Sequence, residues 1–178
     1  MLLSDKHSKT KILTLALFLG LGLGLSACQV RPLYSSTTAS GQSLSTELSS
    51  VEIAEAKTRL EQEIRNSLVF SFTGGGEPAA PAYKLSFDVK KSSDDLTIES
   101  GTGLATTTRV SLTANYQLIR LSDKTVATKG SSFFTAEYAR STQRFANDRA
   151  SLDAENRAAE QIANDIQLRL SAFFAAGT

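Results

Sequence analysis

The sequence holds very little of the side-chain chemistry that enzymes and metalloproteins use most. Its 178 residues include one Cys, one His, one Met and no Trp. The His is His7, so the chain after Cys28 has no residues for a His-based triad, a His metal site or a zinc finger. With 19 Lys and Arg against 18 Asp and Glu, it also lacks the basic excess typical of nucleic-acid binding. We therefore expect no catalytic residues, no metal, no cofactor and no nucleic-acid partner.

The first 27 residues have the parts of a secretory signal. A lysine-rich stretch, Lys6–Lys11, precedes an uncharged apolar run from Ile12 to Leu25, and the small residues Ser26 and Ala27 follow. The apolar run is shorter than the roughly 20 residues that a helix needs to cross a bilayer. We predict a lipoprotein signal peptide over residues 1–27; the alternative is an uncleaved N-terminal membrane anchor.

Cys28 completes a pattern, Leu25-Ser26-Ala27-Cys28, that resembles the lipobox of bacterial lipoproteins. The resemblance implies cleavage before Cys28, a diacylglyceryl thioether on its sulfur and an acyl chain such as palmitate on its amine. Several acyl chains hold a protein on a membrane far better than one. Because Gln29 stands where Asp would favour inner-membrane retention, the resemblance also implies a lipid anchor in the outer membrane, on its periplasmic side.

Two long segments have the spacing of amphipathic helices. The first runs from Ala56 to Phe72, and its apolar face repeats every four residues at Leu60, Ile64 and Leu68. Its expected exposed side carries i,i+4 charge pairs, Lys57–Glu61, Arg59–Glu63 and Glu61–Arg65. The second runs from about Asp148 to Phe174, with an apolar stripe formed by Leu152, Ala159, Ile162, Ala163, Ile166, Leu170 and Phe173. Before it, Arg140–Asn147 is either an irregular segment or an extra turn or two of the same helix.

Four segments have the pattern of strands. The clearest is Thr106 to Leu118, where Val110, Leu112, Ala114, Tyr116 and Leu118 alternate with polar residues. Such alternation predicts a sheet with one core face and one polar face. The other expected strands are Val51–Ile53, Tyr83–Lys90 and Thr125–Ala136, with turns at Ser92–Asp95 and Leu121–Lys124.

The order of these elements is strand, helix, three strands, helix. It predicts an α+β fold in which two helices pack on one face of a four-stranded mixed or antiparallel sheet. We assign this single domain to residues 51–178. Residues 28–50, with their Ser- and Thr-rich stretch, are expected to form the lipidated Cys and a flexible tether.

Known catalytic and phosphate-binding motifs are incomplete in this chain. Gly101-Thr102-Gly103 starts like a dinucleotide fingerprint, but Thr106 stands where the third Gly belongs. Gly74-Gly75-Gly76 lacks the Gly-Lys-Ser/Thr ending of a phosphate loop. Both are interpreted as loops.

The sheet half of the chain carries a modest excess of basic residues. From Ser100 to Ala136 the bases are Arg109, Arg120, Lys124 and Lys129, against one acid, Asp123. One interpretation is a solvated face with strand edges protected by Lys. The other is a surface for an anionic partner.

The mature chain resembles the LptE family of lipopolysaccharide-assembly lipoproteins. Cys28-Gln29-Val30-Arg31-Pro32-Leu33-Tyr34 is similar to the family's Cys-Gly-Phe-Arg-Pro-Leu-Tyr start, with Gln-Val replacing Gly-Phe. Further segments are similar in order and spacing, namely Ile64–Leu68, Tyr83–Leu85, Ala114–Leu118 and the last part of the chain, from Tyr138-Ala139 through Asp153–Ala159 and the final helix.

The resemblance implies a partner and a ligand. Family members have two helices on a four-stranded sheet, plug the outer-membrane β-barrel LptD, assist its assembly and bind lipopolysaccharide during its insertion into the outer leaflet. Lipopolysaccharide is anionic, so bases at strand ends and turns are the expected contacts. These candidate binding residues are Lys90, Lys91, Arg120, Lys124 and Lys129.

Two other functions remain open at this point. The chain could be an envelope lipoprotein that faces the periplasm as an adaptor for another partner. It could also be a periplasmic lipoprotein enzyme, or an enzyme inhibitor, that uses the loop near Gly101.

Overall fold

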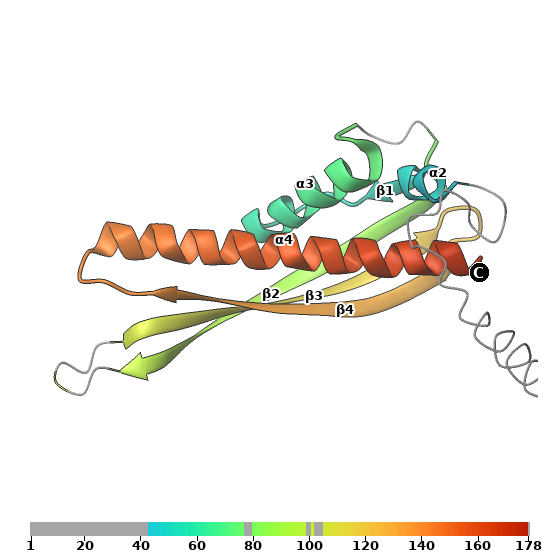
Figure 1. The fold of residues 1–178 in the computed structure, drawn as a ribbon. Coiled ribbons are helices and arrows are strands. Elements are labelled where there is room, and N and C mark those ends of the chain that lie inside the picture. Colours follow the sequence, from blue (N-terminus) through green and yellow to red (C-terminus); the bar gives the residue numbers. More distant parts are fainter. Residues whose placement is uncertain (1–42, 77–79, 99–100, 102–104, 178) are drawn as a thin grey trace, which may run out of the picture. The chain divides into compact units, whose positions relative to one another are not determined.

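The α+β fold predicted from the sequence is confirmed. A computed structural model of the chain describes residues 43–76, 80–98, 101 and 105–177. Its elements (Figure 1) are α2 (Leu44–Ser49), β1 (Val51–Ile53), α3 (Arg59–Thr73), β2 (Tyr83–Ile98), β3 (Ala105–Arg120), β4 (Val126–Ala139) and α4 (Arg144–Ala176). Cys28, the predicted signal peptide and most of the predicted tether lie outside the described residues.

The sheet is mixed and has the order β1-β2-β3-β4. Strand β1 is parallel to β2, while β2–β3 and β3–β4 are antiparallel. The turn expected at Ser92–Asp95 is wrong, because β2 continues through these residues and pairs with Thr108–Ser111 of β3. Ser and Asp are poor strand formers, and here pairing with a long neighbouring strand overrides that preference.

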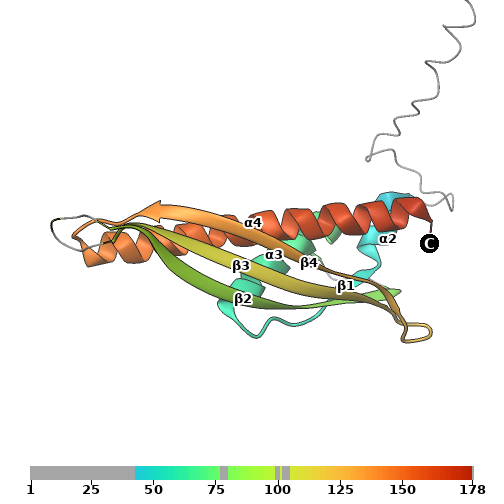
Figure 2. The same cartoon turned by 90° about the horizontal axis from the view of Figure 1, so that it is seen from below.

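Both long helices cover the same face of the sheet (Figures 1 and 2). Helix α4 packs mainly on β4 and also on β3, α3 packs on β1 and β2, and the two helices pack on each other. The alternation expected in β3 is confirmed, because its five apolar residues, Val110, Leu112, Ala114, Tyr116 and Leu118, are all buried. The core therefore lies between this face and the helices.

Helix α3 begins with a capping box. The side chain of Thr58 accepts a hydrogen bond from the backbone N–H of Glu61, and the Glu61 carboxylate accepts from the N–H of Thr58. Glu61 is only 7% exposed, and its carboxylate also accepts a hydrogen bond from the backbone N–H of Lys57, so this cap takes the place of the predicted surface pair with the Lys57 side chain. The pair between Arg59 and Glu63 is present, at 3.7 Å.

Helix α4 is longer than predicted at both ends. None of the residues 144–153 is buried, and Leu152, assigned to the apolar stripe, is 38% exposed. The buried face starts at Ala154 and includes Ile162, Ile166 and Leu170. Leu152 is exposed because the first three turns of α4 lie beyond the core that α3 and α4 form with the sheet. No helix in the described residues is long and apolar enough to cross a bilayer.

The folded region starts earlier than the predicted domain boundary at residue 51. Residues 44–49, inside the predicted tether, form helix α2. Ser43 caps this helix through the N–H of Thr46, and Leu44 and Leu48 are buried in the core. Two leucines four residues apart are enough to fix one turn and a half of helix once they contact an existing core.

A buried carboxylate joins both long helices to the sheet. Glu155 of α4 accepts hydrogen bonds from Arg59 at the start of α3 and from Lys91 of β2, the latter at 2.9 Å. The side chain of Glu155 is 9% exposed, while those of its two partners are 43% and 44% exposed. Burial alone would raise the pKa of Glu155, but the hydrogen bonds and charges of Lys91 and Arg59 outweigh it and lower the pKa below its ordinary value.

Candidate binding face of the sheet

The face of the sheet opposite the helices is open and polar. Figure 2 looks onto this face, which no helix in the described part of the chain covers. Because side chains alternate along a strand, the residues between the buried ones point to this side. They include Ser86, Asp88 and Lys90 of β2, Ser111, Thr113, Asn115 and Gln117 of β3, and Lys129, Ser131 and Glu137 of β4.

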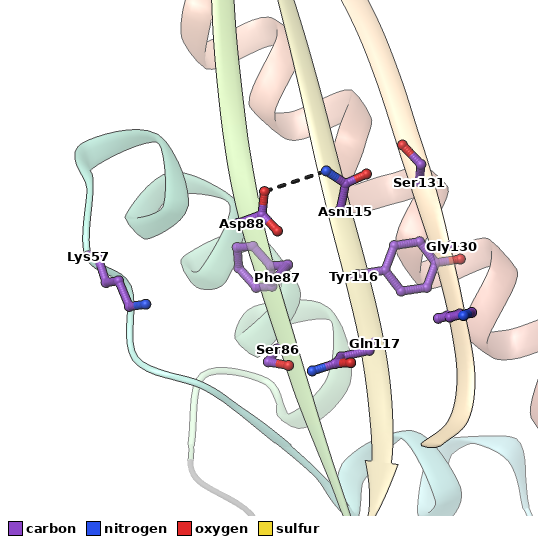
Figure 3. Close-up of a pocket in the computed structure, with 10 residues that line it drawn as sticks. Lys57, Ser86, Phe87, Asp88, Asn115, Tyr116, Gln117, Gly130 and Ser131 are labelled. Atoms are coloured by element: carbon purple, nitrogen blue, oxygen red, sulfur yellow. Dashed lines mark hydrogen bonds between the residues drawn. The ribbon is translucent and has the colours of Figure 1, made fainter. Parts of the chain in front are cut away.

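A hollow of about 710 Å³ lies in the middle of this open face (Figure 3). Two rows of side chains cross its floor. One row is Ser86, Gln117 and Lys129, and the next is Asp88, Asn115 and Ser131. Lys57, in the loop between β1 and α3, completes the lining at the β2 side. Its side chain extends from that loop toward β2 (Figure 3).

Beneath the hollow, Tyr116 points from β3 toward α4, where Arg169 lies close to it. Its ring faces the helices and is 6% exposed, and it lies across Gly130 of β4. Burial is the largest influence on the pKa of Tyr116 and raises it, whereas the nearby charge of Arg169 on α4 lowers it. A Cβ atom at position 130 would lie 2.6 Å from the Tyr116 Oη. Glycine is therefore required at this position by the close approach of the ring.

Gly130→Ala is expected to destabilise the fold by about 1–3 kcal/mol, the usual cost of overfilling a packed site. The added methyl group must push the Tyr116 ring toward α4. Ser131→Ala, at the exposed neighbouring position, should change stability by less than about 0.5 kcal/mol. Urea unfolding of both variants measures the difference, and equal losses would contradict the contact. Adding Tyr116→Leu to Gly130→Ala should cost less than the sum of the two single changes.

The two lysines predicted on β2 lie on opposite faces of the sheet. Lys90 is exposed on the open face, opposite Thr113. Lys91 points to the helix side, where Glu155 holds its ammonium group. Consecutive strand residues always separate in this way, so the two cannot contact one ligand from the same face.

The three predicted bases near the β3–β4 hairpin lie closer together. Arg120 ends β3 and its guanidinium is 3.4 Å from Asp123 in the turn, where Lys124 adopts a positive φ of 59°. The backbone and side chain of Thr125 hydrogen-bond Asp123 and lower its pKa, so this turn holds a fixed negative charge beside Arg120. Lys129 follows on β4 and lines the hollow. Lys90 lies on β2, two strands away from Lys129 on β4. Their partners on β3, Thr113 and Gln117, are four residues apart, so the Cα atoms of the two lysines are separated by roughly 15 Å.

Lys57 lines the hollow but is not among the basic residues that the sequence predicts as contacts. The sequence pattern predicts it in a helical charge pair, but it lies before α3 begins. Only the parallel pairing of β1 with β2 brings its loop beside the open face. Nothing in the local sequence signals this position, whereas a prediction of the β1–α3–β2 crossover could have found it.

The described residues contain no group of three or more His, Cys, Asp or Glu side chains that could hold a metal ion. The hydroxyl, amide, carboxylate and ammonium groups of the hollow are instead suited to hydrogen bonding with a polar ligand.

One family model matches the chain. It is the model described as LptE, lipopolysaccharide-assembly, and it matches residues 46–170, from α2 through most of α4. A sequence comparison with curated proteins finds no match.

Solved structures of bacterial lipoproteins share the fold. A lipoprotein from Caulobacter crescentus CB15 is similar over 76% of this chain and 97% of its own, with a TM-score of 0.62 and 24% identity. Lipoprotein B from Nitrosomonas europaea covers 71% of this chain and 84% of its own, with a TM-score of 0.55 and 12% identity. Rare lipoprotein B from Shewanella oneidensis covers 68% and 92%, with a TM-score of 0.53 and 12% identity. At these identities the likeness concerns the fold alone.

Proposed function

The chain belongs to the LptE family of lipopolysaccharide-assembly proteins, and on this basis we propose that it plugs the outer-membrane barrel LptD, assists its assembly and binds lipopolysaccharide during insertion into the outer leaflet. The observation that carries the proposal is the family match over residues 46–170, which includes all of α3, all four strands and most of α4. In this role the chain acts by binding and not by catalysis.

The proposal includes a lipid anchor at Cys28. Support comes from the lipobox pattern before Cys28, with Gln29 as the residue that favours the outer membrane. The lipid would hold the domain at the periplasmic side of that membrane. Mass spectrometry of the N-terminal peptide tests this step, because an unmodified Cys28 would contradict it.

The open face of the sheet supports a position inside a barrel. A barrel lumen is polar and aqueous, so its contents need polar surfaces on more than one side. Here one whole face of the sheet presents Ser, Thr, Asn and Gln side chains together with charged residues of both signs. Such side chains exchange hydrogen bonds with water for hydrogen bonds with a lumen wall at little cost.

Basic side chains on this face and at its end support binding of an anionic glycolipid. Arg120, Lys124, Lys129 and Lys90 are the proposed lipopolysaccharide contacts, and all are at least partly exposed. Lys91 was predicted as a fifth contact, but its ammonium group already binds Glu155. We therefore assign Lys91 a role in stabilising the fold and not in binding.

The test is co-purification. The full chain, tagged at its C-terminus, is expected to bring down LptD and lipopolysaccharide from outer membranes solubilised in mild detergent. A matched control uses another tagged outer-membrane lipoprotein of the same cells, which should bring down neither. Recovery of the chain without the barrel, at the level of that control, would refute the plug proposal.

A further inference from the structure

Two lysines of the hollow on the open face have free ammonium groups. Lys57 borders it at the β2 side and Lys129 at the β4 side, and Ser86 and Gln117 lie in the row between them. Among the described residues, neither ammonium group takes part in an ion pair or a hydrogen bond. Eight other Lys and Arg side chains of the described region are paired with a carboxylate, including Lys84 and Lys91. The hollow therefore combines two unpaired positive charges with neutral donors and acceptors.

The second row of the hollow carries a negative charge in place of the positive charges. Asp88 carries a negative charge, and its contact within the hollow is a long hydrogen bond of 3.4 Å from the amide of Asn115. Ser131 completes this row with a hydroxyl. A carboxylate only accepts hydrogen bonds, so a ligand at this end must bring donors. A ligand that fits both rows carries an anionic group at one end and hydroxyl groups at the other.

These requirements exclude several classes of ligand. Inorganic phosphate carries too few donors to satisfy Asp88. An acyl chain finds few apolar side chains, because the two aromatic residues of the lining, Phe87 and Tyr116, pack against the core on the helix side. A nucleotide base would need an exposed aromatic ring for stacking, and Phe133, which is exposed on β4, lies outside the lining.

We propose that this hollow binds a saccharide that carries phosphate or carboxylate groups, held by Lys57 and Lys129 at its anionic end and by Asp88 and Asn115 at its hydroxyls. At about 710 Å³ the hollow lies within the roughly 300–1,000 Å³ of small-molecule sites. The proposal rests on the proposed function, since it assigns the saccharide part of lipopolysaccharide to one named site. It also adds Lys57 to the residues that contact the ligand.

The experiment uses the full chain in detergent and a lipid-free probe. The probe is the phosphorylated core oligosaccharide that mild acid releases from lipopolysaccharide, and binding is measured by isothermal titration calorimetry. Lys57→Gln combined with Lys129→Gln is expected to weaken binding by about tenfold or more, because two charge-assisted contacts are lost. Lys57→Arg combined with Lys129→Arg keeps both charges and should retain binding. A thermal melt of each variant should match that of the unchanged chain, since both lysines are exposed.

Three controls make the result specific. Arg109→Gln removes a basic side chain of the same face that pairs with Glu137 and does not line the hollow, and should change affinity less than twofold. Neutral maltotriose and inorganic phosphate should each bind at least tenfold more weakly than the oligosaccharide. A dephosphorylated oligosaccharide that still binds assigns the anionic contact to carboxylates, and one that does not assigns it to phosphates.

The outcomes that overturn the proposal differ from those that overturn the proposed function. Equal affinity of the unchanged chain and the double Gln variant would remove the site, as would phosphate binding as tightly as the oligosaccharide. If the barrel still co-purifies in that case, the proposed function stands alone. If the oligosaccharide binds through Lys57 and Lys129 but no barrel co-purifies, the saccharide site stands and the plug function fails.

Discussion

Ile166→Asp is expected to unfold the domain. Ile166 is fully buried on α4, at the centre of the helix face that packs on the sheet. The change removes a large apolar side chain and leaves a carboxylate without a partner, which together cost on the order of 4 kcal/mol or more. Domains of this size are stable by about 5–15 kcal/mol in total. Circular dichroism and urea unfolding should therefore detect either an unfolded chain or a greatly reduced midpoint.

Leu168→Asp is the matched control for this experiment. Leu168 is on the same helix, two residues further along, and is 50% exposed. The same chemical change there should cost less than about 1 kcal/mol, since the new carboxylate stays in water. Similar losses for both variants would mean that the buried face of α4 is assigned wrongly.

Glu155→Gln is expected to cost about 2 kcal/mol at pH 7. The substitution keeps the shape of the side chain but removes the charge that Arg59 and Lys91 contact. Breaking a buried ion pair costs about 3–5 kcal/mol, and the partial exposure of both cations reduces this value. Glu63→Gln removes an exposed carboxylate that also contacts Arg59, and should cost less than about 0.5 kcal/mol.

The effect of Glu155→Gln should depend on pH in one direction. The pKa of Glu155 is lower in the folded protein than its ordinary value, so the unfolded chain binds a proton more readily. The ion pairs therefore add stability above the unfolded pKa of about 4.3, and this stability is lost as the pH falls through the folded pKa. Urea unfolding at pH 7, 5, 4 and 3 should show the two proteins converge at the acidic end. A difference that stays constant to pH 3 would contradict the charged role of Glu155.

The fold followed from the sequence wherever one periodic pattern coincided with one buried face. The alternation in β3 and the stripe around Ile162 and Ile166 are long, regular and nearly free of polar interruptions, so local pattern and tertiary packing agree. Helix α2 was missed because its two leucines lie in a Ser- and Thr-rich stretch, and only contact with the rest of the core makes them a helix.

The candidate site was less predictable than the fold. Lys129 was selected from charge alone, and it lines the hollow. Lys91 was selected on the same grounds, yet it is bound to Glu155, a residue 64 positions away in sequence that no local pattern connects to it. Lys57 was assigned to a helix because it stands four residues before Glu61, whereas Glu61 is used by the helix cap. For Lys91 a long-range side-chain contact decides the role, and for Lys57 the pairing of β1 with β2 does.

Helix α4 follows all four strands in the chain, and this sequence order constrains how the protein can fold. The sheet residues and α3 are synthesised before the helix that covers β3 and β4, and the partner of Arg59, Glu155, comes 96 residues later. Until then the apolar face of β3 stays open to solvent and to other unfinished chains. A ribosome stalled before Arg144 would leave a strand-rich fragment that aggregates.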